Sequence, residues 1–323
     1  MKRVAKPEGE YNVVIEDVPT PEISDAEVLI RADRTLISRG SEIWRRYIRP
    51  EAIDHQSMGY SFAGTIAEVG SRVTGFSQGD RVASVAPHAE YVAVDVLNHR
   101  VQPSVVHLPD NVSMEAGTFW PLATSSVLWM WQTGARATDT MVIQGQGLVG
   151  SGCMQVVNTD PNPRVIAVDS LPLRCDLARK LGADEVVDAS QEDPVEAVRR
   201  LTDGAGADIA VEAVGGRAGA GAFLQAQDMV KRGGLIQILG LYEDEPLPLD
   251  SGKIQGKRLV GGYLDSSIRP KGSDLALQLL DEGKIKVEEM ITHRFGYEEA
   301  PEAFDLLYNR LGETMAVILT WDE

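Results

Sequence analysis

Three glycines near the middle of the chain stand at the spacing of a dinucleotide-binding fingerprint. They belong to the hexamer Gly145-Gln146-Gly147-Leu148-Val149-Gly150, which follows a predicted strand and opens a predicted helix. Gly145 permits a tight turn, Gly147 lets the backbone approach a pyrophosphate, and Gly150 lets the helix pack closely on the strand. The pyrophosphate charge is favoured at the helix N-terminus. The pattern therefore predicts that residues 145–150 bind a dinucleotide.

An acidic residue indicates which dinucleotide binds. Asp169 ends the next predicted strand, at a distance from the glycines where a carboxylate accepts hydrogen bonds from the adenosine ribose. The same carboxylate repels a 2′-phosphate, so the sequence favours NAD over NADP. Arg174 follows on the next predicted helix. It can reach the same ribose and soften this preference, or it can be a solvated residue of that helix.

Two further predicted strands end in an apolar residue followed by glycine. These pairs are Val214-Gly215 and Leu239-Gly240, the second followed by Leu241. Ligands bind at the carboxyl ends of the strands in open parallel sheets. We therefore expect these pairs to face the nicotinamide, where glycine lets the ring approach the backbone.

The composition excludes several classes of function. The 323 residues include 31 Lys or Arg and 48 Asp or Glu, and the net charge of −17 repels the phosphate backbone of nucleic acids. Two cysteines, Cys153 and Cys175, are too few for a disulfide framework or a four-cysteine zinc site. No apolar run approaches the roughly 18 residues of a membrane-spanning helix. We expect a protein of a reducing, cytoplasmic compartment that binds a small-molecule substrate and neither membrane nor nucleic acid.

The order of predicted elements indicates two domains. Short strands with glycine turns, such as 27–32, 64–70 and 90–94, fill the first third and predict a barrel-like domain. Strands are then expected at 141–143, 164–169, 185–187, 208–212, 234–239 and 258–260, and helices at 148–157, 173–181, 194–201 and 218–230. Buried strands that alternate with helices predict a parallel sheet covered on both faces. The predicted fold class is α/β, with a doubly wound parallel sheet of Rossmann type beside the barrel.

Three segments together resemble the medium-chain dehydrogenase/reductase superfamily, of the zinc-type alcohol dehydrogenase-like kind. They are the run from Gly59 to Val82, the fingerprint with its acid, and the tail from Ile291 to Phe304. The resemblance implies a GroES-like β-barrel of residues 1–115 and 266–323 and a Rossmann domain of residues 116–265, with the active site in the cleft. It also implies hydride transfer between nicotinamide and a carbonyl, alcohol or activated alkene.

The resemblance further implies a homodimer or homotetramer. Residues 259–263 read as an edge strand, which can pair with its copy across a dimer or be capped within the monomer.

Zinc-dependent relatives carry a motif that this chain departs from. Their C-G-[ST]-D and G-H-E motifs correspond here to Arg39-Gly40-Ser41-Glu42 and Gly59-Tyr60-Ser61, and a later cysteine position falls near Ser125. Zinc takes deprotonated sulfur, nitrogen or oxygen ligands, whereas the guanidinium of Arg39 stays cationic. The sequence therefore predicts a zinc-independent member with no metal site.

Without zinc, a hydrogen-bond donor must take the negative charge that develops on the substrate oxygen. Tyr60 is the expected donor, because a phenol can donate to an oxyanion and exchange its proton. Ser41 keeps the hydroxyl of the family's proton relay. Arg39 can lower the pKa of Tyr60 or bind an anionic group of the substrate.

Each of these three residues also has a structural interpretation. Tyr60 can be a packed barrel residue with its hydroxyl in water, Ser41 can brace its loop, and Arg39 can pair with Glu42 or another acid.

Two other features near these residues invite a functional interpretation. Segment 42–50 mixes aromatic and basic residues, and we expect either a lid that recognises a polar or anionic substrate or a solvated helix face. His88 titrates near neutral pH and can act as an acid or base, although its loop setting favours a surface position.

Three functions remain open from the sequence. The leading hypothesis is a zinc-independent NAD(H)-dependent oxidoreductase for a secondary alcohol or ketone of a polar hydroxylated metabolite, such as a sugar or cyclitol. The alternative is an enone or quinone reductase that acts on a C=C bond. The third is a redox-inactive NAD(H)-binding protein, because the fingerprint indicates cofactor binding and not turnover.

Overall fold

The computed structural model describes residues 1–240 and 246–321, so Leu241 lies outside the described residues. The chain forms two compact units. The first unit comprises residues 1–124, 265–283 and 287–323, and the second comprises residues 125–264 and 284–286. The first boundary falls within helix α2 (Trp120–Thr133).

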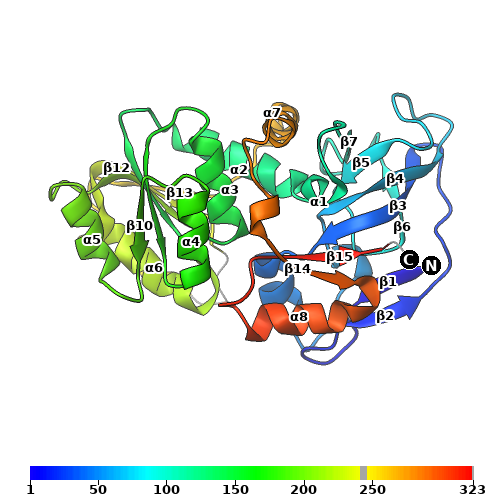
Figure 1. The fold of residues 1–323 in the computed structure, drawn as a ribbon, viewed down its shortest axis with the longest axis horizontal. Coiled ribbons are helices and arrows are strands. Elements are labelled where there is room, and N and C mark those ends of the chain that lie inside the picture. Colours follow the sequence, from blue (N-terminus) through cyan, green and yellow to red (C-terminus); the bar gives the residue numbers. More distant parts are fainter. Residues whose placement is uncertain (241–245, 322–323) are drawn as a thin grey trace. The chain divides into compact units, whose positions relative to one another are not determined.

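The first unit is built around a seven-stranded, mostly antiparallel sheet (Figure 1). Its strands are β3 (Glu27–Leu36), β4 (Phe62–Val69), β5 (Arg81–Ser84), β6 (Tyr91–Asp95), β7 (Val105–His107), β14 (Ile291–Gly296) and β15 (Ala316–Thr320), and β1 (Lys2–Ala5) pairs with β2 (Val14–Asp17). Its helical segments are η1 (Arg39–Tyr47), η2 (His55–Ser57), α1 (Met114–Gly117), α7 (Arg269–Asp281), η3 (Glu288–Met290), η4 (Tyr297–Glu299) and α8 (Ala300–Asn309).

Strand β3 organises this sheet. It pairs antiparallel with β4, β6 and β15, so that the C-terminal strand of the chain joins the N-terminal sheet. Buried residues such as Val28, Ile30 and Phe62 form one core with the helix α8 residues Phe304 and Leu307. This core supports the loop that carries Tyr60 and the helical segment η1.

The second unit contains a six-stranded parallel sheet in the order β10-β9-β8-β11-β12-β13. The chain alternates through β8 (Thr140–Gln144), α3 (Leu148–Val157), β9 (Arg164–Asp169), α4 (Pro172–Lys180), β10 (Glu185–Asp188), α5 (Pro194–Leu201), β11 (Ala207–Glu212), α6 (Gly216–Met229), β12 (Val230–Ile238) and β13 (Arg258–Gly261). Figure 1 shows helices on both faces of the sheet. The predicted α/β fold with a Rossmann-type sheet is confirmed. The strand order reverses between β8 and β11, the place where such sheets bind ligands.

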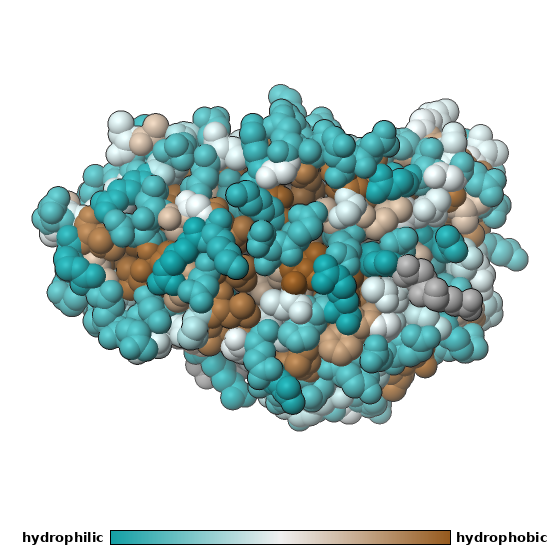
Figure 2. All heavy atoms as spheres, viewed as in Figure 1, coloured by the Kyte–Doolittle hydropathy of each residue, from teal (hydrophilic) through white to brown (hydrophobic). Residues whose placement is uncertain are grey.

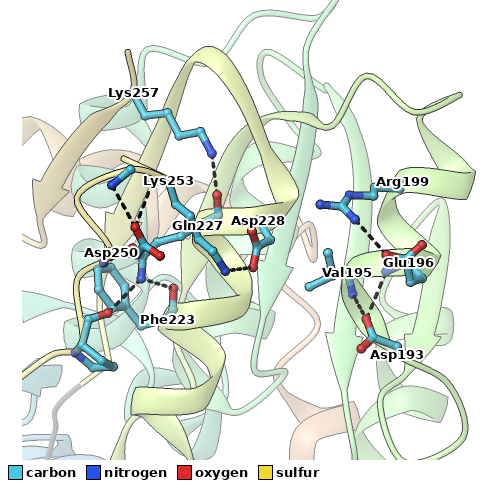
Figure 3. A network of polar contacts seen from close by, with 12 residues as sticks. Asp193, Val195, Glu196, Arg199, Phe223, Gln227, Asp228, Asp250, Lys253 and Lys257 are labelled. Atoms are coloured by element: carbon cyan, nitrogen blue, oxygen red, sulfur yellow. Dashed lines mark hydrogen bonds and ion pairs between the residues drawn. The ribbon is translucent and has the colours of Figure 1, made fainter. Parts of the chain in front are cut away.

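A segment between β12 and β13, residues 246–257, is anchored to helix α6 by one buried amide (Figure 3). The Gln227 side chain is fully buried and donates to the carbonyl oxygen of Pro248 at 2.9 Å. Its Oε1 accepts the backbone N–H of Asp250 at 2.9 Å. Lys253 adds an ion pair with Asp228 at 2.6 Å. These contacts fix segment 246–257 along α6, the helix that starts at Gly215–Gly216.

Polar residues dominate the face of the molecule drawn in Figure 2, and apolar residues show through in separate patches. Among the described residues, every helix is too short or too polar to cross a bilayer.

Candidate functional site

The fingerprint loop needs glycine at two of its three glycine positions for reasons visible in the structure. Gly145 has a φ of +84°, and a Cβ there would lie 2.8 Å from the backbone nitrogen of Val214. A Cβ on Gly150 would run into the carbonyl oxygen of Gly145. The turn after β8 and the turn after β11 therefore touch at the switch point of the sheet.

Gly147 is the N-cap residue of α3, and Leu148 and Val149 form the first turn of that helix. N–H groups in a first helical turn lack acceptors within the helix, which suits a bound phosphate. The nearest atom to a Cβ on Gly147 would be Nη1 of Arg174, at 3.7 Å. The structure thus brings residues 145–150 and Arg174 together, as the predicted cofactor site requires.

Asp169 holds the fingerprint loop in place. Its Oδ2 accepts the backbone N–H of Gln146 at 2.7 Å, and its Oδ1 accepts the N–H of Leu171 at 3.0 Å. Nη1 of Arg174 lies 3.8 Å from the same Oδ2. Asp169 is therefore a brace for the loop as well as the expected ribose ligand, a role that spacing alone did not reveal.

A buried glutamate organises the other predicted cofactor residues. Glu212 ends β11, is fully buried, and accepts the N–H of Val214 through Oε1 at 2.8 Å. Its backbone carbonyl accepts the N–H groups of Leu239 and Gly240 at 2.8 and 3.0 Å. A Cβ on Gly240 would lie 2.8 Å from the nitrogen of Gly215, whose φ is +61°. The two predicted pairs therefore meet around Glu212, which sequence reasoning treated only as the end of a strand.

Tyr60 lies in the first unit with its hydroxyl held by serines. The phenol is half-buried and donates to Oγ of Ser38 at 2.6 Å. Burial raises the pKa of Tyr60 above its ordinary value, and the charge of Glu42 acts in the same direction. The hydrogen bonds between the phenol and the hydroxyls of Ser38 and Ser41 oppose that shift. Tyr60 is therefore a protonated hydrogen-bond donor at neutral pH, and its hydroxyl is engaged by protein groups.

The Arg39 side chain contacts other groups of the first unit, and its roles toward Tyr60 or an anionic substrate group stay predictions. Its Nε donates to the carbonyl oxygen of Leu307 at 3.1 Å, and its guanidinium lies 5.0 Å above the ring of Trp44. The charge of Arg46 opposes the rise in the pKa of Tyr60.

His88 and segment 42–50 also differ from the sequence expectation. His88 is 1% exposed, and its Nε2 lies 2.8 Å from Oε2 of Glu42, whose side chain is fully buried. Oε1 of Glu42 accepts the backbone N–H of Ser38 at 2.8 Å. Ile43 and Tyr47 of η1 are buried in the core of the first unit, whereas Arg45 is exposed, so only part of this segment is a solvated helix face. A contact between residues 42 and 88 has no local sequence signal.

Gly59 lets the Tyr60 loop approach His88. Its φ is +108°, and a Cβ there would lie 2.8 Å from the backbone nitrogen of His88. The loop is thus held against the buried pair of Glu42 and His88.

The donor set around Tyr60 does not fit a zinc ion. The family's ligand positions correspond here to Arg39, Tyr60 and Ser61. Arg39 carries a guanidinium, and the Tyr60 phenol donates to Ser38. The buried hydroxyl of Ser61 has no hydrogen-bond partner among the described residues. Within residues 1–240 and 246–321, no group of three His, Cys, Asp or Glu side chains is arranged to hold a metal.

Comparison with known proteins agrees with this architecture. The model of the alcohol dehydrogenase GroES-like domain matches residues 24–118, and that of the zinc-binding dehydrogenase matches residues 149–281. The D-arabitol-phosphate dehydrogenase of Enterococcus avium is 30% identical over 338 residues, which cover 94% of each chain. The chain belongs to the zinc-type alcohol dehydrogenase-like family of medium-chain dehydrogenases/reductases.

Other members of the family are similar over nearly the whole chain. The L-threonine 3-dehydrogenase of Bacillus licheniformis is 29% identical over 354 residues, covering 99% of this chain and 98% of the relative. The solved structure of the alcohol dehydrogenase TADH from Thermus sp. ATN1 has a TM-score of 0.83 at 25% identity and covers 99% of both chains. This medium-chain dehydrogenase is therefore an oxidoreductase of the alcohol dehydrogenase type that uses a nicotinamide cofactor.

The second unit of this dehydrogenase fits such a cofactor. The positive φ values of Gly145 and Gly215 and the close approach at Gly240 keep side chains away from both turns at the carboxyl edge of the sheet. The Arg174 side chain is 13% exposed, and no described residue accepts a hydrogen bond from its Nε. These turns, with Asp169 and the first turn of α3, are the residues that would hold the dinucleotide.

Proposed function

We propose that this dehydrogenase is NAD(H)-dependent, acts without zinc, and interconverts a secondary alcohol and a ketone in a polar hydroxylated metabolite such as a sugar or cyclitol. The observation that carries the proposal is the Tyr60 phenol, which is kept protonated by burial and held by Ser38 and Ser41. A donor of this kind can take over the role of a Lewis acid at the substrate oxygen. The named relatives that act on D-arabitol phosphate and L-threonine support an alcohol as substrate.

The proton step is assigned to Tyr60. The nicotinamide, when bound, accepts or supplies the hydride. In the direction of ketone reduction, Tyr60 turns its O–H from Ser38 to the carbonyl oxygen and transfers the proton as negative charge develops there. The phenolate that remains accepts hydrogen bonds from the hydroxyls of Ser38 and Ser41 and is stabilised by the charge of Arg46. In alcohol oxidation the proton moves in the opposite direction.

NAD is proposed over NADP because of Asp169. A carboxylate at the end of β9 favours ribose hydroxyls and disfavours a 2′-phosphate. Arg174 partly offsets that charge, since its Nη1 lies 3.8 Å from Oδ2 of Asp169.

The C=C reductase is the second candidate, and it is favoured by the replacement of zinc ligands with Arg39, Tyr60 and Ser61. Incubation with NADH deuterated at C4 and a panel of ketones and conjugated enones distinguishes the candidates. Deuterium on the carbonyl carbon supports the proposal, whereas deuterium on the β-carbon of an enone supports the second candidate. NADH that binds without any transfer to the panel or to polyol-derived ketones would favour a redox-inactive cofactor-binding protein.

We also propose a reducing, cytoplasmic compartment and a homodimer or homotetramer. Cys153 and Cys175 are buried free thiols, and burial raises the pKa of Cys153 to about 12 and that of Cys175 to about 11, so both are inert. Strand β13 lies at the edge of its sheet and is flanked by the exposed Tyr263, which supports association through that edge.

A further inference from the structure

Arg46 is a cation in the candidate site whose charge the described protein leaves without an anionic partner. Its Nη1 is buried, and no described residue accepts a hydrogen bond from it. None of the ion pairs among the described residues includes Arg46. Its charge acts on the Tyr60 phenol.

The winding of η1 explains why Arg46 occupies this place. Ile48 donates its N–H to the carbonyl of Ile43 at 3.3 Å, a hydrogen bond between residues five apart that is typical of a π-helix. In an α-helix, residues four apart share a face, so Arg45 would lie beside Ser41. In the wider turn of η1, Arg46 takes that position, and Arg45 is exposed. Short π-helical segments are frequent at functional sites.

The nearby carboxylate does not neutralise Arg46. Both oxygens of Glu42 are used, since Oε1 accepts the N–H of Ser38 and Oε2 lies 2.8 Å from Nε2 of His88. The other basic side chain of this segment close to the site, Arg39, is engaged by Leu307 and Trp44. The guanidinium of Arg46 therefore acts on the proposed proton donor while both oxygens of Glu42 are already engaged.

We propose that Arg46 binds an oxyanion group, a phosphate or a carboxylate, of the hydroxylated substrate whose alcohol reacts at Tyr60. This inference rests on the proposed function and specifies its substrate class. A guanidinium matches carboxylate and phosphate oxygens in geometry and gives charge-assisted hydrogen bonds to both. A substrate held by its anionic group at Arg46 places a neighbouring hydroxyl or carbonyl within reach of the phenol, because both residues act on the same small region of the first unit.

Binding and turnover are measured separately, so that the two proposals can fail independently. Binding of D-arabitol, D-arabitol phosphate and D-gluconate to the NADH-loaded full chain is measured by calorimetry. We expect the native protein to bind at least one of the two anionic compounds roughly 10- to 100-fold more tightly than D-arabitol, the range for a hydrogen bond to a charged group. The two anionic probes show whether phosphate or carboxylate is the recognised group.

Variants test whether Arg46 is responsible. Arg46→Met should remove the preference for the anionic compound over D-arabitol, while Arg46→Lys restores part of it. Arg45→Met is the matched control, because its side chain is one residue away but exposed, and it should keep the full preference. Equal binding of neutral and anionic compounds by the native protein, or a preference that survives in Arg46→Met, would overturn the inference. Anionic binding that depends on Arg46 without oxidation of any alcohol would uphold it and contradict the proposed function.

Discussion

Tyr60 is the residue on which the proposed chemistry depends. Tyr60→Phe removes the proton donor and keeps the ring, so we expect kcat for ketone reduction to fall about 10²- to 10⁴-fold, the usual contribution of a general acid. Binding of NADH, measured by fluorescence, should not change. Turnover that persists in Tyr60→Phe would show that another group supplies the proton.

The raised pKa of Tyr60 predicts a pH profile for the same reaction. The phenol is a proton donor only while it is protonated, so ketone reduction should continue through neutral pH and be lost as the pH rises through a pKa above the ordinary 10.0. The raised value follows from burial first and from the charge of Glu42 second. Glu42→Gln should therefore move the alkaline limb of the kcat profile to lower pH. A limb near neutral pH in the native protein would point to a different acid.

Asp169 should control both the choice of cofactor and the order of the fingerprint loop. Asp169→Asn removes the charge that repels a 2′-phosphate, and we expect the ratio of kcat/KM for NAD over NADP to fall roughly tenfold, equivalent to one charge-assisted hydrogen bond. Affinity for both cofactors should also decrease, because the carboxylate accepts the N–H groups of Gln146 and Leu171. Asp176→Asn, at an exposed acid on the following helix α4, is the control and should leave the ratio unchanged.

The contacts of individual side chains were the hardest feature to predict from the sequence. Two of the fingerprint glycines are demanded by local contacts, such as that between Gly150 and the carbonyl oxygen of Gly145. The charge of Arg46 acts on the pKa of Tyr60, although the sequence singled out Arg39 and not Arg46 as a candidate for this effect. The buried contact between Glu42 and His88 joins residues from distant parts of the sequence, so it depends on tertiary packing that no local pattern encodes.

At the scale of elements, one buried amide should stabilise the second unit. Gln227→Leu leaves the carbonyl of Pro248 and the N–H of Asp250 without their partner, and an unsatisfied buried group costs about 1–3 kcal/mol. We expect the free energy of unfolding in urea to fall by about that amount. Gln191→Leu, at an exposed position, should have little effect. An equal loss in both variants would show that the amide network has no special role.

Elements of the second unit were the easiest to predict. Helices 148–157 and 194–201 and strand 164–169 have the bounds that the sequence indicated, because apolar strands and capped helices alternate there with few interruptions. Helix α5 shows the local cause, since Asp193 accepts the N–H groups of Val195 and Glu196 at its start. In contrast, η1 has no such signal, and its buried Glu42 reads as a surface residue in any one-dimensional pattern.

At the scale of the whole molecule, strand β13 is the proposed surface through which two copies associate. This strand ends the six-stranded sheet, and Leu259 is 39% exposed and Tyr263 is 66% exposed. An exposed edge strand with apolar side chains is a template for pairing with another chain. Association through β13 would extend the sheet across two copies and cover those side chains.

Leu259→Lys should therefore shift the molecule toward the monomer in sedimentation experiments, since a charge on an edge strand opposes pairing. Leu249→Lys, on an exposed residue outside the strands, is the control and should leave the assembly intact. Two copies that each carry a net charge of −17 repel one another, so added salt should strengthen association of the native protein. If Leu259→Lys assembles like the native protein, the interface lies on another surface. If salt also weakens association, that surface is held by opposite charges and not by the apolar edge of β13.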